Sequence, residues 1–274
     1  MTLNAVTLKA MTLNEMTLNE MTLNEMIADL EAEQNSLEEV VADLDEETWK
    51  LATGSPGWTI ADQISHLQFF DERAALAMND PDAFAVDRRL IISSAPRDLS
   101  VELGRRVSGA ELFQAWRLSR LALIDAAQKV DPTVRVPWYG PSMAVKSFLT
   151  ARLMECWAHG EDIAQAVGVP RTPSARLKHV AHIGVGARAF SLMINQLPED
   201  SRSIRVELTA PDGEIWTWGD ESSEQRVLGD ALDFCLVVTQ RRALPDSQLM
   251  VLGDSATRWM QIAQAFAGAP TRKT

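Results

Sequence analysis

The chain has 274 residues and a formal net charge of −12, because 38 Asp and Glu side chains outnumber 26 Lys and Arg side chains. So acidic a chain repels phosphate backbones, and none of its apolar runs reaches the roughly 18 residues of a membrane span, so we expect neither nucleic acid nor a membrane as a partner. Its two cysteines exclude a secreted domain built on disulfides, and we expect a cytoplasmic protein.

Residues 1–25 repeat a five-residue unit related to MTLNE. A period of five matches neither the 3.6 residues of a helical turn nor the two of a strand. The Met and Leu side chains would therefore spread around a helix instead of forming one apolar stripe. We expect a repetitive, disordered extension outside the folded domains.

Four long helices are predicted in the N-terminal half, because apolar residues return there at three- and four-residue steps. Capping boxes mark two helix starts, Thr59 with Asp62 and Ser108 with Glu111. A polar, proline-containing stretch over residues 79–97 is expected to connect the second helix to the third. This pattern predicts a four-helix bundle over residues 26–171. The expected helices cover residues 26–51, 59–78, 108–130 and 142–167.

The pattern changes after Pro170 and Pro173. Two alternating runs flank Pro211-Asp212-Gly213, which predicts a β-hairpin with an Asp-Gly turn. A mixture of helices and a small sheet indicates a separate α+β domain over residues 172–274, so the fold class of the whole chain is α+β. The expected elements are helices at 176–197, 228–238 and 255–266, and strands at 204–208, 214–218 and 248–252.

Three residues suggest a metal site in the bundle. Glu155 and His159 lie four residues apart on the fourth predicted helix, so they project from one face, and His66 lies on the second. Bundle cores form metal sites from such inward side chains. Two nitrogens and one oxygen suit Zn²⁺ or another divalent transition metal, and three ligands leave a fourth position open. Asp62 and Asp162 could accept the second N–H of an imidazole, or act as ligands themselves.

The spacing of Glu155 and His159 is also common on ordinary exposed helices. The apolar neighbours Leu153, Trp157 and Ile163 weigh against that alternative, because an unpaired Glu155 on an apolar helix would be costly. On the residues alone, the metal site and the plain surface helix are about equally supported.

Two segments resemble a known family. Residues 57–67 (GWTIADQISHL) are similar to the first ligand helix of the DinB-like bundle superfamily, and more closely to that of mycothiol-dependent maleylpyruvate isomerase. Residues 151–163 (ARLMECWAHGEDI) are similar to the Glu-x-x-x-His helix of that family. The resemblance spans about residues 26–169. It implies a DinB-like metal-binding bundle in which His66, Glu155 and His159 are the zinc ligands, and mycothiol as a co-substrate.

The resemblance extends to two further parts of the chain. Residues 172–274 are similar to the sterol-carrier-like domain that follows the bundle in maleylpyruvate isomerase, where an arginine acts on the substrate. Of the three arginines available, Arg226, Arg241 and Arg242, we take Arg241 and Arg242 as the catalytic candidates. The loop that begins with Trp138 and Tyr139 resembles an uncharacterised actinobacterial branch of the family, and these two residues are the candidates for binding the cofactor.

Other residues have plainer interpretations. His179 and His182 lie three apart on one predicted helix, without a nearby acid or thiol, and we interpret them as packed or partly exposed side chains. Cys156 adjoins Glu155 but faces another side of the helix, so we interpret it as a small core residue. Trp216 and Trp218 alternate on a strand and are expected to pack, with a ligand platform as the alternative.

Three functions remain open. The first is a metal-dependent transferase or isomerase that uses a low-molecular-weight thiol, with the thiolate formed at the open metal position and added to an electrophilic substrate. The second is a hydrolase in which the metal activates water. The third is a non-catalytic protein that binds metal or lipid, in which the bundle forms a homodimer.

Overall fold

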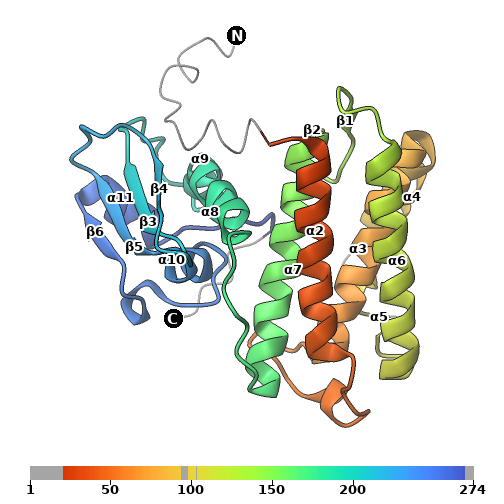
Figure 1. Ribbon diagram of the computed structural model, residues 1–274. Coiled ribbons are helices and arrows are strands. Elements are labelled where there is room, and N and C mark those ends of the chain that lie inside the picture. The colour runs from red at the N-terminus through yellow and green to blue at the C-terminus, as the bar shows by residue number, and fades with distance from the viewer. Residues whose placement is uncertain (1–20, 94–97, 103, 269–274) are drawn as a thin grey trace. The chain divides into compact units, whose positions relative to one another are not determined.

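The computed structural model describes residues 21–93, 98–102 and 104–268 (Figure 1). The chain divides into two compact units, of which one is Thr22–Arg171 and the other contains the residues from Thr172 onward. Most of the predicted N-terminal extension lies outside the described residues. Within the described part of the chain, every helix is too short or too polar to cross a membrane.

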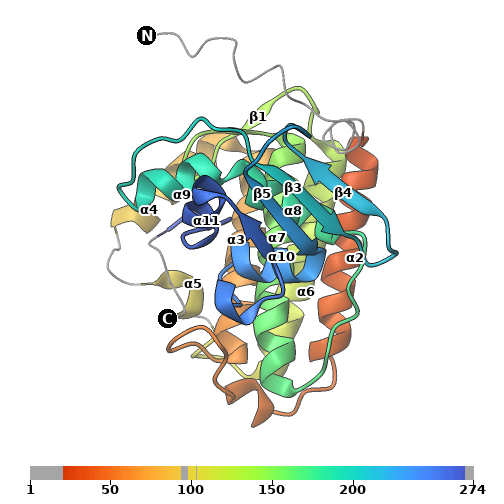
Figure 2. The same ribbon diagram turned by 90° about the vertical axis from the view of Figure 1, so that its left-hand side faces the viewer.

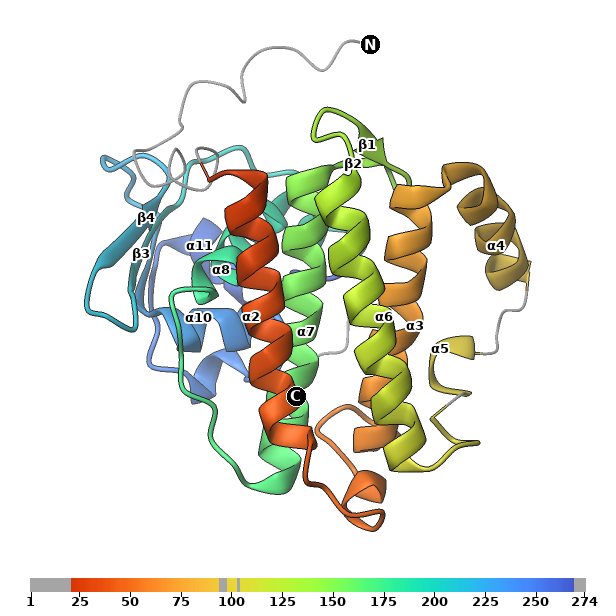
Figure 3. The same ribbon diagram turned by 45° about the vertical axis from the view of Figure 1, so that its right-hand side comes forward.

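The unit Thr22–Arg171 is built around four long helices, α2, α3, α6 and α7 (Figure 3). Each of α2 and α3 packs against both α6 and α7, so the four form a closed bundle around one core. Two shorter helices, α4 and α5, and a 3₁₀ turn, η1, pack on α3. The bounds are α2 Leu23–Val41, η1 Thr48–Lys50, α3 Ile60–Asn79, α4 Pro81–Ser93, α5 Leu99–Glu102, α6 Gly109–Lys129, β1 Arg135–Val136, β2 Met143–Ala144 and α7 Val145–Val167.

Capping boxes determine where three of these helices begin. The predicted boxes at Thr59 and Ser108 are both formed, and in each the hydroxyl accepts the backbone N–H three residues later while the acid at that position bonds back to the cap. A third box joins Thr22 to Glu25. Helix α2 therefore begins at Leu23, three residues earlier than predicted, and includes the end of the repetitive segment.

The bundle unit differs from the prediction in two places, an additional helix and a later helix start. Residues 79–97 were expected to be a connector without a helix, but Pro81–Ser93 form α4. Proline is favoured in a first helical turn, and the Asp80 carboxylate accepts the N–H of Ala83 at 2.9 Å. The fourth long helix begins at Val145 instead of Ser142, because Met143 and Ala144 pair with residues 135 and 136 as a two-stranded ribbon.

The bundle core is apolar and includes residues from all four long helices. Its largest members are the indoles of Trp49 and Trp116, which are at most 3% exposed. Full burial of each Leu, Ile or Val side chain in such a core stabilises the fold by about 1.5–3 kcal/mol. Around the indoles pack Leu37, Val41, Ile60, Ile64, Leu67, Leu112, Cys156 and Ile163.

The second unit contains a four-stranded sheet with strand order β4-β3-β5-β6 (Figure 2). Strand β3 is antiparallel to β4 and parallel to β5, and β5 is antiparallel to β6. Helix α10 packs on β3 and β5, and α8 packs on α10. The bounds are α8 Leu177–Gly186, α9 Arg188–Ile194, β3 Arg205–Thr209, β4 Ile215–Trp218, β5 Arg226–Asp230, α10 Ala231–Val238, η2 Leu244–Asp246, β6 Met250–Leu252 and α11 Asp254–Met260.

The predicted hairpin is confirmed as β3 and β4, and Gly213 in its turn has a φ of +88°, which favours glycine. Three helices differ from the prediction. The helix expected at 176–197 is divided at Ala187, next to Gly186, into α8 and α9. Residues 226–230 form a strand, and α10 begins only after Asp230, whose carboxylate accepts the N–H of Leu232 at 2.8 Å. The closing helix ends at Met260.

Candidate metal centre

His66, Glu155 and His159 converge on one point between α3 and α7. Each offers one ligand atom, and the three atoms all lie within 4.8 Å of one another. The two imidazole centroids are 4.7 Å apart, and His159 Nε2 is 3.2 Å from Glu155 Oε2. The predicted helix positions explain the arrangement, because Glu155 and His159 are one turn apart on one face of α7. Three such donors fit a divalent transition metal in a site with an open position.

A buried amide orients the His159 ring. His159 Nδ1 forms a short hydrogen bond with Gln63 Oε1. Gln63 Nε2 lies 2.8 Å from Thr53 Oγ1 and 3.4 Å from Asp162 Oδ2. The amide oxygen can only accept, so His159 Nδ1 carries a proton, and the lone pair of neutral His159 is on Nε2, which faces Glu155.

A hydroxyl and a carboxylate orient His66 in the same way. His66 Nδ1 lies 3.0 Å from Ser100 Oγ, and Ser100 donates its own hydroxyl proton to Asp98 Oδ1 at 2.6 Å. Because the hydroxyl proton is committed to Asp98, Ser100 accepts from His66 Nδ1. The lone pair of neutral His66 is then also on Nε2. Helix α5 is held on α3 by Ser65, whose hydroxyl donates to the Ser100 carbonyl at 2.7 Å.

The charge of Glu155 is stabilised by its neighbours. Its side chain is 25% exposed. Burial by itself would raise the pKa of Glu155, but the hydrogen bond and charge of His159, with smaller contributions from His66 and Arg152, lower that pKa to about 2. Glu155 is therefore a carboxylate across the ordinary pH range, which is the form that binds a cation.

Aromatic rings surround the two imidazoles. Trp58 stacks on His159 with the ring planes 10° apart and the centroids 5.8 Å apart, and it also lies 5.1 Å from His66. On the other side, Phe70 lies 4.6 Å from His66. These rings give the site apolar walls, which strengthen electrostatic interactions inside it.

The loop residues Trp138 and Tyr139 belong to an aromatic cluster that reaches the site through Phe70. Tyr139 lies 5.7 Å from Phe70, and Trp138 lies 6.1 Å from it and stacks on Phe84 with the planes 4° apart. Burial raises the pKa of Tyr139 to about 12, so its hydroxyl is protonated at neutral pH. The two candidate cofactor-binding residues thus lie one aromatic ring away from the metal ligands.

The two aspartates considered as imidazole partners have other roles. Asp62 accepts from Thr59 in the capping box and from Arg105 Nε at 2.8 Å. Asp162 contacts the Gln63 amide and accepts from Ser55 Oγ at 2.9 Å. The direct partners of the imidazoles, Gln63 and Ser100, were missed. Gln63 could have been found, because it lies three residues before His66 on the same helix face.

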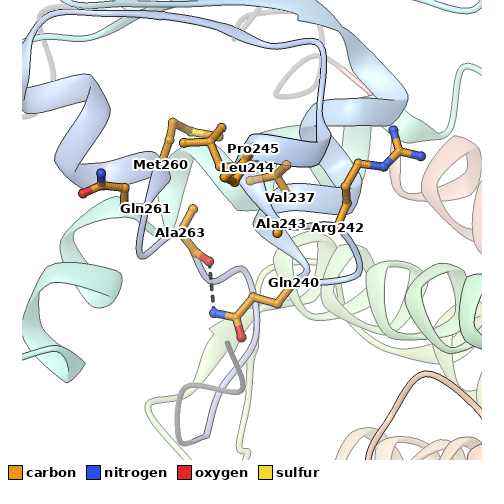
Figure 4. Close-up of a pocket in the computed structure, with 9 residues that line it drawn as sticks. All are labelled: Val237, Gln240, Arg242, Ala243, Leu244, Pro245, Met260, Gln261 and Ala263. Atoms are coloured by element: carbon orange, nitrogen blue, oxygen red, sulfur yellow. Dashed lines mark hydrogen bonds between the residues drawn. The ribbon is translucent and has the colours of Figure 1, made fainter. Parts of the chain in front are cut away.

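The candidate arginines lie in the second unit. Arg242 ion-pairs with Asp233 and lines a small pocket, in which Figure 4 shows its guanidinium directed away from Leu244 and Met260. Arg241 Nη1 donates to the Thr239 carbonyl at 2.8 Å. Arg226 Nε donates to a backbone carbonyl at 3.1 Å, and Nη1 faces a carboxylate oxygen at 3.4 Å.

The remaining candidates are consistent with structural roles. His179 is buried, and His182 Nδ1 lies 3.4 Å from Trp218 Nε1. Burial and the neighbouring His179 lower the pKa of His182. Trp216 and Trp218 are both at most 3% exposed, in agreement with packing. Burial raises the pKa of the Cys156 thiol, so it is protonated at neutral pH.

Comparisons with known proteins identify relatives of the whole chain. The family described as mycothiol maleylpyruvate isomerase N-terminal domain matches residues 30–164. Two uncharacterized proteins of Mycobacterium tuberculosis, from strains CDC 1551 and H37Rv, are each 43% identical over 252 residues, which cover 90% of this chain and 96% of the relative.

Two solved structures share the fold. They are crystal structures of the mycothiol-dependent maleylpyruvate isomerase and of a histidine-to-alanine mutant of that enzyme. Both align with a TM-score of 0.60 over 93% of this chain and 99% of theirs, at 15% and 13% identity respectively. The α+β chain therefore has the maleylpyruvate isomerase fold.

Proposed function

The chain belongs to the family defined by the mycothiol maleylpyruvate isomerase N-terminal domain, and from this relationship we propose that it is a zinc-dependent transferase or isomerase that uses a low-molecular-weight thiol such as mycothiol. In this proposal residues 26–171 hold the metal and bind the thiol. Residues 172–274 contribute contacts to an electrophilic substrate, with Arg241 and Arg242 as the candidate cations.

The observation that carries the proposal is the convergence of His66, Glu155 and His159 within 4.8 Å. Hydrogen bonds at both Nδ1 atoms leave the two Nε2 atoms as the ring nitrogens that can bind a metal, and Glu155 is ionised. This donor set suits Zn²⁺, and a three-residue set is typical of catalytic sites, which keep one coordination position for a substrate or solvent atom.

The chain's own residues prepare the site in two ways. His66, Glu155 and His159 would hold the ion, while Gln63 and Ser100 keep the imidazoles turned toward it. A bound zinc ion supplies Lewis acidity, which stabilises a thiolate at neutral pH.

Aromatic side chains next to these ligands would limit the access of water and receive the apolar parts of the reactants. Trp58 and Phe70 flank the two imidazoles. We propose that Trp138 and Tyr139, which contact Phe70, extend this surface to bind the thiol. The protonated phenol of Tyr139 is a hydrogen-bond donor suited to a carbonyl or carboxylate of the bound molecule.

The reaction proposed is the addition of the thiol sulfur to an electrophilic carbon. In a conjugated acid or ketone, the new S–C bond forms as the electron pair of the C=C bond moves toward the carbonyl oxygen, and the thiol proton passes to solvent. Rotation about the resulting single bond, followed by loss of the thiol, gives a cis–trans isomer. If the neighbouring carbon instead takes a proton from solvent, the thioether adduct is retained and is the product of a transferase.

Elemental analysis of the purified full-length protein tests the metal site. We expect close to one zinc per chain in the wild type, and loss of most of it in His66→Ala and in Glu155→Ala. His182→Ala, which removes a histidine of the second unit, is the matched control and should retain its metal. Full metal content in both site variants would exclude the site.

Zinc-edge X-ray absorption during titration with mycothiol tests the role of the thiol. We expect one sulfur to enter the zinc coordination sphere, together with turnover of an electrophilic substrate that depends on added thiol. Turnover without any thiol would instead support the hydrolase. A wild-type protein that is purified without metal and does not take up zinc would contradict both enzymatic proposals.

A further inference from the structure

We propose that Gln63 is a positioning residue that fixes one tautomer and one orientation of His159, and thereby sets the affinity of the site for its metal. Thr53 and Asp162 fix the direction of the Gln63 amide in turn. The inference rests on the proposed function for its consequence in metal binding, but its structural part can be measured in the metal-free protein.

The direction of the Gln63 amide follows from its two other partners. Thr53 donates its hydroxyl proton to the Trp58 carbonyl at 3.2 Å, so Thr53 Oγ1 can only accept from Gln63. Asp162 Oδ2, which accepts the Ser55 hydroxyl proton, is also an acceptor, and it lies 3.4 Å from the same amide nitrogen. Two acceptors on one side require Gln63 Nε2 there. Gln63 Oε1 therefore faces His159.

The tautomer of His159 follows from that oxygen. Gln63 Oε1 has no proton to donate, so the neutral tautomer with its lone pair on Nδ1 would place two acceptors against each other. Nδ1 therefore carries a proton. In the metal-free protein Nε2 lies 3.2 Å from Glu155 Oε2 and can donate a second proton to it, and loss of that proton gives the tautomer whose Nε2 lone pair can bind a metal at the point where the candidate ligands converge.

Burial makes this contact hard to replace. Gln63 is 0%, Asp162 2% and His159 7% exposed. Bulk water cannot readily take the place of a missing amide oxygen at such a position, so removing it leaves His159 Nδ1–H buried without its acceptor. A buried donor without an acceptor is unfavourable, and the other tautomer or a rotated ring would partly relieve that cost.

The amide also joins the two helices that supply the ligands. Gln63 lies on α3 three residues before His66, and Asp162 lies on α7 three residues after His159. The contacts of Gln63 with His159 and Asp162 thus link α3 to α7 about one helical turn from the ligand atoms. This link is made by protein groups alone, so it orders the site before the metal binds.

Two full-length variants test the proposal. Gln63→Leu removes the acceptor at similar volume. Gln68→Leu is the matched control, because it makes the same change at another buried glutamine of α3, five residues further along. The dissociation constant for Zn²⁺, measured by competition with a chelator, is expected to rise about 10–100-fold in Gln63→Leu. In Gln68→Leu it should stay within about threefold of the wild type.

The second readout is the tautomer of His159 in the metal-free protein, from long-range ¹H–¹⁵N NMR of protein labelled on its four histidines. We expect the wild type and Gln68→Leu to show a proton on Nδ1, and Gln63→Leu to show a mixture. Thermal unfolding of each metal-free variant separates a loss of stability from a loss of affinity.

The outcomes distinguish this inference from the proposed function. A wild-type His159 without a proton on Nδ1 would overturn the inference, whether or not any variant folds. A Gln63→Leu protein with the wild-type tautomer and zinc affinity would also overturn it. If the wild type binds no zinc, the proposed function fails, while the tautomer still decides whether Gln63 positions His159.

Discussion

Arg152 of α7 donates to Asp71 of α3 through both Nε and Nη2, which lie 3.2 and 2.9 Å from the same carboxylate oxygen. The two side chains are 5% and 4% exposed. Burial raises the pKa of Asp71, and the charge of Arg152 opposes that rise. In this buried ion pair, the charge of each side chain is therefore neutralised by the charge of the other.

Removal of either partner should be strongly destabilising. We expect Asp71→Leu and Arg152→Met each to lower the free energy of unfolding by about 3–5 kcal/mol, because the remaining charge is left buried. The double variant should lose less than the sum of the two. Urea denaturation measures these changes. The exposed pair of Lys129 with Asp125 is the control, and Asp125→Ala should cost at most about 1 kcal/mol. If Asp71→Leu and Arg152→Met each lost no more unfolding free energy than Asp125→Ala, the prediction would be wrong.

Removal of the metal should lower the melting temperature. A ligand that binds only the folded state stabilises it by about 2.7 kcal/mol at a free concentration one hundred times its dissociation constant. We expect a chelator to lower the melting temperature of the wild type, and excess Zn²⁺ to restore it. His66→Ala should melt at the same temperature with and without chelator. A zinc-dependent shift of equal size in this variant would place the metal elsewhere.

Acid should remove the contribution of Glu155 to stability. The pKa of Glu155 is about 2 in the folded metal-free protein against an ordinary value of 4.5. When the pKa of a carboxyl is lower in the folded than in the unfolded state, its ionised form stabilises the folded state. That stabilisation is complete at a pH above the unfolded pKa and is lost as the pH falls to the folded pKa. The difference in unfolding free energy between the wild type and Glu155→Gln should therefore shrink between pH 4.5 and about 2. Chemical denaturation across this range measures it, and a difference independent of pH would refute the shift.

Gly109 should not tolerate a side chain. A Cβ at this position would lie 2.3 Å from Trp49 Cδ1, and Trp49 is 3% exposed in the core. We expect Gly109→Ala to lose about 1–3 kcal/mol of stability by overpacking. Gly140→Ala is the control, because no atom lies within 4 Å of the added Cβ. Equal stabilities of the two variants in urea would be inconsistent with this packing.

The four bundle helices could be predicted because their signals are local. The capping boxes at Thr59 and Ser108 act within four residues, and the apolar faces follow the helical period. The convergence of the three candidate ligands could also be predicted in part, because the i, i+4 spacing of Glu155 and His159 fixes their common face. The proximity of His66 needed the further assumption that α3 and α7 are neighbours, which the resemblance supplied.

Other features depend on contacts that local patterns do not reveal. Ser100 lies 34 residues after His66, and only the docking of α5 on α3 brings the two together. Helix α4 was missed because its apolar residues are mostly exposed, with Phe84 as its one buried residue. The predicted helix at 228–238 included the last three residues of β5, because apolar residues continue through that segment. Pairing of β5 with β3 determines that residues 226–230 are extended.

Both cysteines of the chain, Cys156 and Cys235, are buried free thiols, and burial keeps the first of them protonated. Neither is exposed enough for a reagent in solution to alkylate it while the fold is intact. If the protein brings reactive electrophiles to an external thiol, as proposed, its own sulfhydryls are shielded from the same chemistry. The catalyst would then survive repeated turnovers without inactivating itself.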